Sequence, residues 1–194
     1  MATCQAISAV CEAVITLLRE SPQPEEFIKR HLEFQVYLSN NFFQPMAAGV
    51  SLFLYRIYPN GTHRTPTGRL DPNGQRFRTQ LPLDLHFLLT AWGKEASLQH
   101  AIAGWMMRIL EDTPILPASL LNQDIFHPDE TVEISLTELT TEEMFRIWEV
   151  IVHHAYQISV PYVARNVKLE SKLLLSAGEP IQARTFKARK LESR

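Results

Sequence analysis

The chain has 194 residues, enough for a single domain that buries about 70% of the surface its unfolded form would expose. Its formal net charge of −2 argues against generic nucleic-acid binding, because domains with that function are strongly basic. We expect neither a membrane span nor a signal peptide, since no apolar run approaches about 20 residues and the N-terminus lacks a basic start followed by a cleavage site.

The first third of the chain predicts one long helix and two strands. Apolar side chains between Thr3 and Glu20 recur at helical spacing, which indicates an amphipathic helix. Residues 31–38 alternate as a strand does, although residues 24–30 could begin a short helix instead. Residues 50–58 are apolar on both faces, which is typical of a strand covered on both sides.

Five further elements follow the loop after residue 58. They are a strand at 83–90, a helix at 95–111, a strand at 131–139, a helix that begins with a capping box at 140–143, and a strand at about 155–168. Pro161 removes a main-chain donor from the last strand, which predicts an edge strand or a bulge. The order of elements predicts an α+β fold, with a mainly antiparallel sheet of four to five strands flanked by helices.

The long connection at residues 59–81 is the most unusual segment. It carries Arg64, Arg69, Arg76 and Arg78 against a single acid, Asp71. Connections of this length in compact domains are uncommon and are usually functional or disordered. The sequence Asp-Pro-Asn-Gly at 71–74 is a strong signal for a type I turn, so we expect a projecting basic hairpin. Arginines flanking an aromatic, Phe77, favour contact with a macromolecule over a merely solvated loop.

The C-terminal segment, residues 171–194, differs from the domain before it. It has no clear core face, and its basic residues outnumber its acidic residues by six to two. We therefore divide the chain into a domain at 1–170 and an extended basic arm at 171–194. The basic residues of this arm are Lys172, Arg184, Lys187, Arg189, Lys190 and Arg194.

Complete catalytic or cofactor motifs are absent from the sequence, and we predict neither a metal nor a cofactor. Cys4 and Cys11 lie roughly 10 Å apart along the first predicted helix, which predicts reduced thiols and a cytosolic origin. Two alternatives stay open. A small enzyme could be centred on Asp84 and His86, which share one strand face, if a pocket perturbs the histidine. A small nucleic-acid-binding module could use the basic loop and tail, if these merge into one stripe.

Four segments together resemble a known family. They are AISAVCEA at 6–13, GVSLFLYRIYPN at 49–60, PLDLHFLLTAW at 82–92 and SVPYVAR at 159–165. In this order they are similar to the cap, or tail-terminator, proteins of extracellular contractile injection systems, which are phage-tail-like particles. The resemblance covers Ile7 to Glu170 and rests on structural motifs. It implies a tail-terminator-like fold, long catalogued as a domain of unknown function.

The resemblance implies a structural protein and not an enzyme. Family members form a ring, expected to be six-fold, on the distal end of the inner tube and sheath, where they stop polymerisation and couple sheath to tube. The implied partners are further copies, the inner-tube protein, the sheath protein and a second cap paralogue, with no nucleic acid and no membrane. Assembly is expected in the cytoplasm, in a particle that is released or membrane-associated. The expected contact residues are Arg64, Arg69, Arg76, Phe77, Arg78, Tyr162, Arg165, Lys172, Arg184, Lys187, Arg189 and Lys190.

Overall fold

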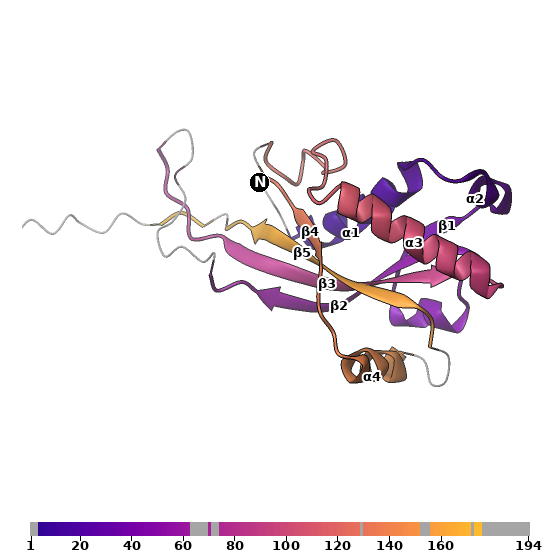
Figure 1. Cartoon of the computed structure of the whole chain (residues 1–194). Coiled ribbons are helices and arrows are strands. Elements are labelled where there is room, and N and C mark those ends of the chain that lie inside the picture. The colour runs from indigo at the N-terminus through magenta and orange to yellow at the C-terminus, as the bar shows by residue number, and fades with distance from the viewer. Residues whose placement is uncertain are drawn as a thin grey trace, which may run out of the picture.

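The computed structural model describes residues 4–62, 70, 74–128, 130–151, 156–171 and 173–175. Within them, helices are interspersed among the strands along the chain (Figure 1). In chain order these are α1 (Ala6–Glu20), α2 (Glu25–Arg30), β1 (Glu33–Tyr37), the 3-10 helix η1 (Ser39–Phe43), β2 (Gly49–Pro59), β3 (Leu81–Trp92), α3 (Ala96–Asp112), β4 (Glu133–Leu136), α4 (Thr141–Ile151) and β5 (Ser159–Leu169). None of the described helices is long and apolar enough to cross a bilayer.

The strands form one sheet in the order β1-β2-β3-β5-β4. β1 runs parallel to β2, and the other three pairings are antiparallel. The predicted α+β fold with a mainly antiparallel sheet is therefore confirmed. Both the strand predicted at 31–38 and the short helix considered at 24–30 are present. The helix α2 ends at Arg30, and the strand β1 begins three residues later.

β5 lies inside the sheet, between β3 and β4, so the prediction of an edge strand is wrong. The Thr137 N–H donates to the Pro161 carbonyl over 3.1 Å. The N and O of one strand residue point to the same side, so the nitrogen of Pro161 also faces the chain at Thr137, which follows β4. β4 ends one residue before Thr137, so the missing donor falls where that pairing stops. The alternative prediction, that this strand carries a bulge, is confirmed, but the bulge is not at Pro161: the β3–β5 register shifts between Leu83 and Leu85, opposite Asn166 with its φ of 66°.

One face of the sheet is covered by α1 and α3, and the larger core lies there (Figure 1). The predicted apolar stripe of α1 is buried, with Val14 and Leu18 fully inaccessible to solvent. β3 contributes Leu85, Phe87 and Leu89, each at most 1% exposed. Because a fully buried side chain of this kind stabilises a protein by about 1.5–3 kcal/mol, this layer holds both helices against the sheet.

The opposite face carries a second, aromatic core beneath η1 and α4. Phe42 lies at its centre and contacts the rings of Tyr37, Phe53, Trp92 and Trp148 at centroid distances of 5.3–6.1 Å. Both faces of β2 are thus covered at this end of the sheet, as its sequence predicts. Beyond the aromatic core, residues 56–59 of β2 are exposed, so the far end of this face is open.

Candidate interface

The basic loop after β2 returns on itself close to the position of the predicted turn. Leu70 and Arg76 form an antiparallel bridge, which brings the two sides of the loop together as expected for a hairpin. Gly74 lies between them with φ of 77°, a left-handed conformation that glycine adopts without steric cost. Residues 71–73 of the predicted turn lie outside the described part of the chain.

The returning side of the loop pairs with the segment that follows β5. The Arg78 N–H donates to the Leu173 carbonyl over 2.9 Å, and the Leu175 N–H donates to the Arg76 carbonyl over 2.7 Å. The residues between these bonds, Phe77 and Leu174, are register partners. These contacts form a short antiparallel ladder between two distant parts of the chain.

This ladder continues the β3–β5 pairing past the end of the sheet. Nearer the sheet, the Gln80 side-chain amide donates to the Glu170 carboxylate over 2.9 Å, next to the last β3–β5 partners. Figure 1 shows the two segments projecting together beyond the strands at the left of the view. We call this projection the arm, defined as Leu70, residues 74–78 and Leu173–Leu175.

The arm has one face that combines charge with apolar surface. Opposite partners share a face and sequence neighbours alternate, so Arg76, Arg78, Leu173 and Leu175 lie on the same side. All four are exposed, and the two leucines keep 58% and 43% of their surface accessible. Phe77 is half-buried on the other side of the ladder, so its neighbours Arg76 and Arg78 are more exposed than its own ring.

The remaining predicted contact residues divide into three groups. Arg165 is exposed on β5, opposite Glu133 of β4 in the register, and lines a hollow of about 490 Å³ together with Ile115 and Asn166. Tyr162 is buried and is treated below. The others lie outside the described residues: Arg64, Arg69, Lys172, Arg184, Lys187, Arg189 and Lys190. The division into a domain at 1–170 and an extended basic C-terminal segment at 171–194, which is not the arm defined above, stays a prediction.

Tyr162 belongs to the core and not to a contact surface, which corrects its prediction as an interface residue. It is 3% exposed, and its ring stacks on Phe87 with a centroid distance of 6.1 Å. Burial, followed by the nearby negative charge of Glu111, raises the pKa of Tyr162 to about 12. The alternation of β5 turns this side chain toward α1 and α3, where a partner cannot reach it.

Asp84 and His86 lie on one face of β3, as predicted, but they have different partners. Both carboxylate oxygens of Asp84 accept from the Asn60 side-chain amide, at 3.2 and 3.1 Å. His86 is half-buried beside the Tyr55 ring, and burial lowers its pKa, with a further lowering by the charge of Arg56. Among the described residues, no group of three or more His, Cys, Asp or Glu side chains could hold a metal ion.

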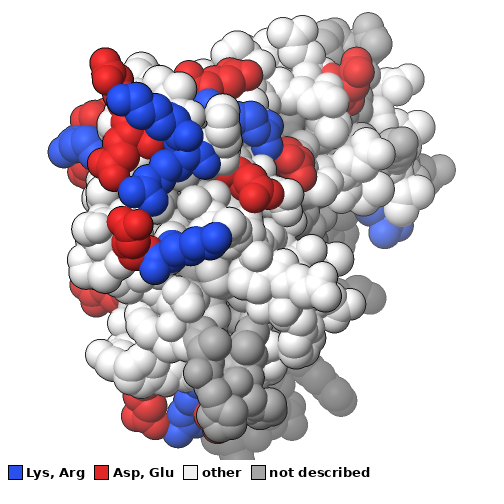
Figure 2. All heavy atoms as spheres, turned by 90° about the vertical axis from the view of Figure 1, so that its right-hand side faces the viewer, with Lys and Arg blue, Asp and Glu red and all other residues white. Residues whose placement is uncertain are grey.

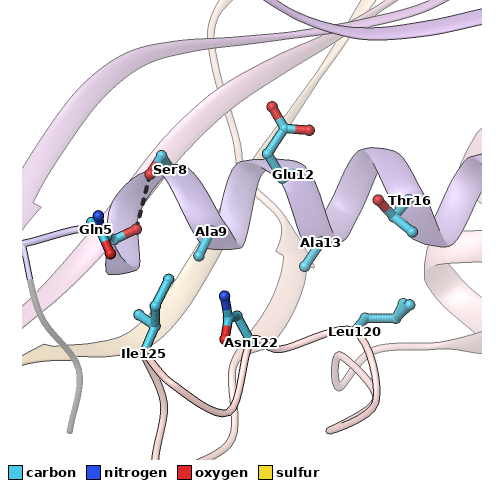
Figure 3. A pocket seen from close by; sticks show the side chains of 9 residues that line it. All are labelled: Gln5, Ser8, Ala9, Glu12, Ala13, Thr16, Leu120, Asn122 and Ile125. Atoms are coloured by element: carbon cyan, nitrogen blue, oxygen red, sulfur yellow. Dashed lines mark hydrogen bonds between the residues drawn. The ribbon is translucent and has the colours of Figure 1, made fainter.

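A groove between α1 and the segment at 120–125 was missed by the sequence analysis. Its volume is about 390 Å³. In Figure 3, Ala9 and Ala13 of α1 point toward this segment, Ile125 points back toward the helix, and the Glu12 carboxylate points away from the segment. The sequence did hold a signal, since small residues four apart on one helix face leave room beside the backbone. The full lining is Gln5, Ser8, Ala9, Glu12, Ala13, Thr16, Leu120, Asn122 and Ile125.

A sequence family described as Pvc16 N-terminal domain matches residues 9–183, which include all strands, the helices from α2 onward and the arm. The chain belongs to this family. The resemblance to contractile injection cap proteins is therefore confirmed at the level of the family. No protein of curated function matches the sequence.

Two solved structures are similar to this Pvc16-family chain. One is the PVC sheath/tube terminator of an extracellular contractile injection system in the extended state, with a TM-score of 0.67 and 16% identity, covering 100% of this chain and 66% of that chain. The other is the anti-feeding prophage cap, a tube-terminating cap, with a TM-score of 0.62 and 13% identity, covering 92% of this chain and 60% of that chain. The likeness shows a shared fold, and this chain spans less than two thirds of either protein.

Proposed function

We propose that this chain is the structural cap of a contractile injection system, forming a ring on the distal end of the inner tube and sheath. There it ends their polymerisation and couples sheath to tube. The observation that carries the proposal is the family match over residues 9–183, together with two similar structures that are both described as terminators. The proposed partners are copies of itself in a six-fold ring, the inner-tube protein, the sheath protein and a second cap paralogue. Assembly takes place in the cytoplasm, in a particle that is released or membrane-associated.

The chain acts by contact and not by catalysis. An enzyme centred on this pair would need Asp84 as a free acid beside His86. Instead, both carboxylate oxygens of Asp84 accept hydrogen bonds from the Asn60 side-chain amide. The hollows described above are lined by other residues. A projecting arm with exposed arginines and leucines is a feature that recognition surfaces favour, because arginine offers several donors on a flat head.

Electron microscopy of particles assembled without the chain tests this function. We expect overlong, unstable or uncapped tubes, and normal length after the full chain is supplied again. An Asp84→Asn, His86→Gln double variant should restore tube length as well as the parent does, since it removes the acid–base pair and keeps a side-chain oxygen that can accept from Asn60. Tubes of normal length in the absence of the chain would sink the proposal, and a double variant that folds but fails to restore length would favour the enzyme.

A further inference from the structure

The small net charge of the chain hides two regions of opposite sign. The loop at 59–81 holds four arginines and one acid. Between Arg108 and Arg146, by contrast, the sequence contains nine acidic residues and neither Lys nor Arg. These acids are Glu111, Asp112, Asp124, Asp129, Glu130, Glu133, Glu138, Glu142 and Glu143. Regions of opposite sign on one molecule favour contact between copies and fix their orientation.

One wall of the groove beside α1 comes from the acidic stretch of sequence. Residues 120–125, which form one of its walls, belong to that region, and Asp124 is exposed between the lining residues Asn122 and Ile125. On the opposite wall, Glu12 is an exposed lining residue whose carboxylate points away from this segment. The first 18 residues of the chain contain no Lys or Arg, so the helix that forms this wall brings no positive charge until Arg19. The groove thus combines apolar groups, such as Ala13 and Ile125, with polar side chains, and an exposed acidic residue belongs to each wall.

We propose that the arm of one copy docks in the α1 groove of a second copy. Leu173 and Leu175 would lie against the small and aliphatic side chains of the groove, Ala9, Ala13, Leu120 and Ile125. Arg76 and Arg78, on the same face of the arm, would reach the carboxylates of the two walls. The inference rests on the proposed ring and names the two surfaces that join its subunits.

The occupant is a second copy because the arm is held away from its own groove. Main-chain hydrogen bonds of 2.9 and 2.7 Å keep Leu173–Leu175 against Arg76–Arg78, in line with β3 and β5. The arm projects beyond the end of the sheet, whereas α1 packs across the face of β1, β2 and β5 (Figure 1). Folding back into the same molecule would require breaking the ladder that forms the arm.

The end of the molecule that carries α2 is a weaker receptor for the arm. It exposes Ile28 and a hollow of about 360 Å³, but its charges are already paired. Arg30 lies 3.8 Å from Glu26 and 3.4 Å from Glu95. Figure 2 shows Lys and Arg interleaved with Asp and Glu on this side. The carboxylates of this surface already have cations beside them, whereas Glu12 and Asp124 form no ion pair with the described residues.

An arm and a groove are different surfaces, so their contact is head-to-tail. Interfaces of this kind generate closed rings when the rotation between subunits closes, and open filaments when it does not. An arm that paired with another arm would instead give a two-fold dimer. Docking of the arm in the groove is therefore compatible with a ring, whereas pairing of two arms would stop at a dimer.

Cysteine cross-linking of the full chain tests the contact directly. In a Cys4→Ser background, Leu173→Cys places a thiol on the arm and Thr16→Cys places one in the groove. Cys11 can stay, because burial raises its pKa to about 12 and the reactive thiolate is scarce. On oxidation, the chain with both cysteines should give a ladder of linked oligomers. Mixing the two single-cysteine chains, each of different mass, should give only the mixed dimer.

Three results would overturn the docking: a disulfide within one chain, a dimer of the Leu173→Cys chain with itself, or no cross-link at any protein concentration. A disulfide requires Cα atoms within about 7 Å, so random collisions contribute little to the yield. Circular dichroism of each variant before oxidation confirms that the fold is retained.

Charge reversal separates specific docking from general attraction. An Arg76→Glu, Arg78→Glu chain should lose cross-linking by about tenfold, and a Glu12→Arg, Asp124→Arg chain by a similar factor. Mixing the two reversed chains should restore the cross-link between the reversed arm and the reversed groove. The control Lys29→Glu, Lys94→Glu has the same charge change on exposed residues elsewhere and should cross-link as the parent does. Equal losses in the control and the arm variant would defeat the inference.

The docking and the cap function fail in different experiments. Tubes of normal length without the chain defeat the function, whichever surfaces join its copies. Controlled tube length together with an absent arm–groove cross-link defeats only the docking.

Discussion

Phe77 and Leu174 face each other across the arm, between two main-chain hydrogen bonds. This pair joins the basic loop before β3 to the segment after β5, two regions that look independent in the sequence. The loop and the start of the C-terminal segment therefore form one structural unit. A change in either part alters the backbone partners of the other.

Shortening the loop should release Leu175. Replacing residues 62–80 with a tight turn removes the Arg76 carbonyl that accepts from the Leu175 N–H, while β2 and β3 keep their own pairing. We expect the Leu175 amide to exchange with solvent about tenfold faster, since one hydrogen bond contributes about 0.5–1.5 kcal/mol. Hydrogen exchange followed by mass spectrometry checks this, with β3 amides as the control. Unchanged exchange at Leu175 would mean that other contacts hold the segment.

Gly49→Ala should destabilise the pairing of β1 with β2. Gly49 has φ of 148°, and an added Cβ would lie 1.9 Å from the Glu33 carbonyl oxygen. We expect a loss of roughly 3 kcal/mol or more in the free energy of unfolding, measured by urea denaturation. Gly104→Ala is the matched control. It lies in α3 with nothing within 4 Å of the added Cβ, and should stabilise by about 0.5–1 kcal/mol. The same sign for both variants would contradict this account.

Ser51→Ala should reduce stability although it removes a single oxygen. The Trp92 indole N–H donates to the Ser51 hydroxyl over 2.8 Å, in a buried site. Without this acceptor a buried donor is left unsatisfied, so we expect a loss of about 1–3 kcal/mol. Ser8→Ala is the control, because the exposed Ser8 hydroxyl bonds only a carbonyl one turn earlier, and its loss should stay within about 0.5 kcal/mol. Equal effects of the two substitutions would refute the role of the indole bond.

The pKa of His86 should respond to its neighbours in opposite directions. Burial holds it below its ordinary value of 6.5, Arg56 and Arg165 lower it further, and Asp84 raises it. Arg56→Gln should therefore raise the pKa of His86, and Asp84→Asn should lower it, as followed by NMR of the imidazole ring. Because the pKa of His86 in the folded chain lies below its unfolded value, folding favours the neutral imidazole. The contribution of His86 to the free energy of unfolding is therefore fully present above pH 6.5 and is lost as the pH falls through the folded pKa. Shifts of the same sign in both variants would show that another charge controls His86.

The sequence by itself determined the elements whose side chains repeat with a regular period. The buried stripe of α1 and the two apolar faces of β2 follow from local spacing, which depends only on helix and strand geometry. The capping box at the start of α4 is present as predicted, with the Thr140 N–H donating to the Glu143 carboxylate over 2.9 Å and the Glu143 N–H to the Thr140 hydroxyl over 3.2 Å. The excess of arginine in the loop at 59–81 also depends on residue types alone, and the role of this loop as a contact region stays a prediction.

Only the tertiary structure decided which strands are neighbours. Pro161 suggested an edge, yet β5 lies inside the sheet, because its missing donor falls where β4 ends. The same placement buries Tyr162, which as a polar aromatic could equally have faced a partner. The arm and the α1 groove each join residues far apart in the chain. Such pairings depend on how separate elements fill one core, and no period within a single segment encodes them.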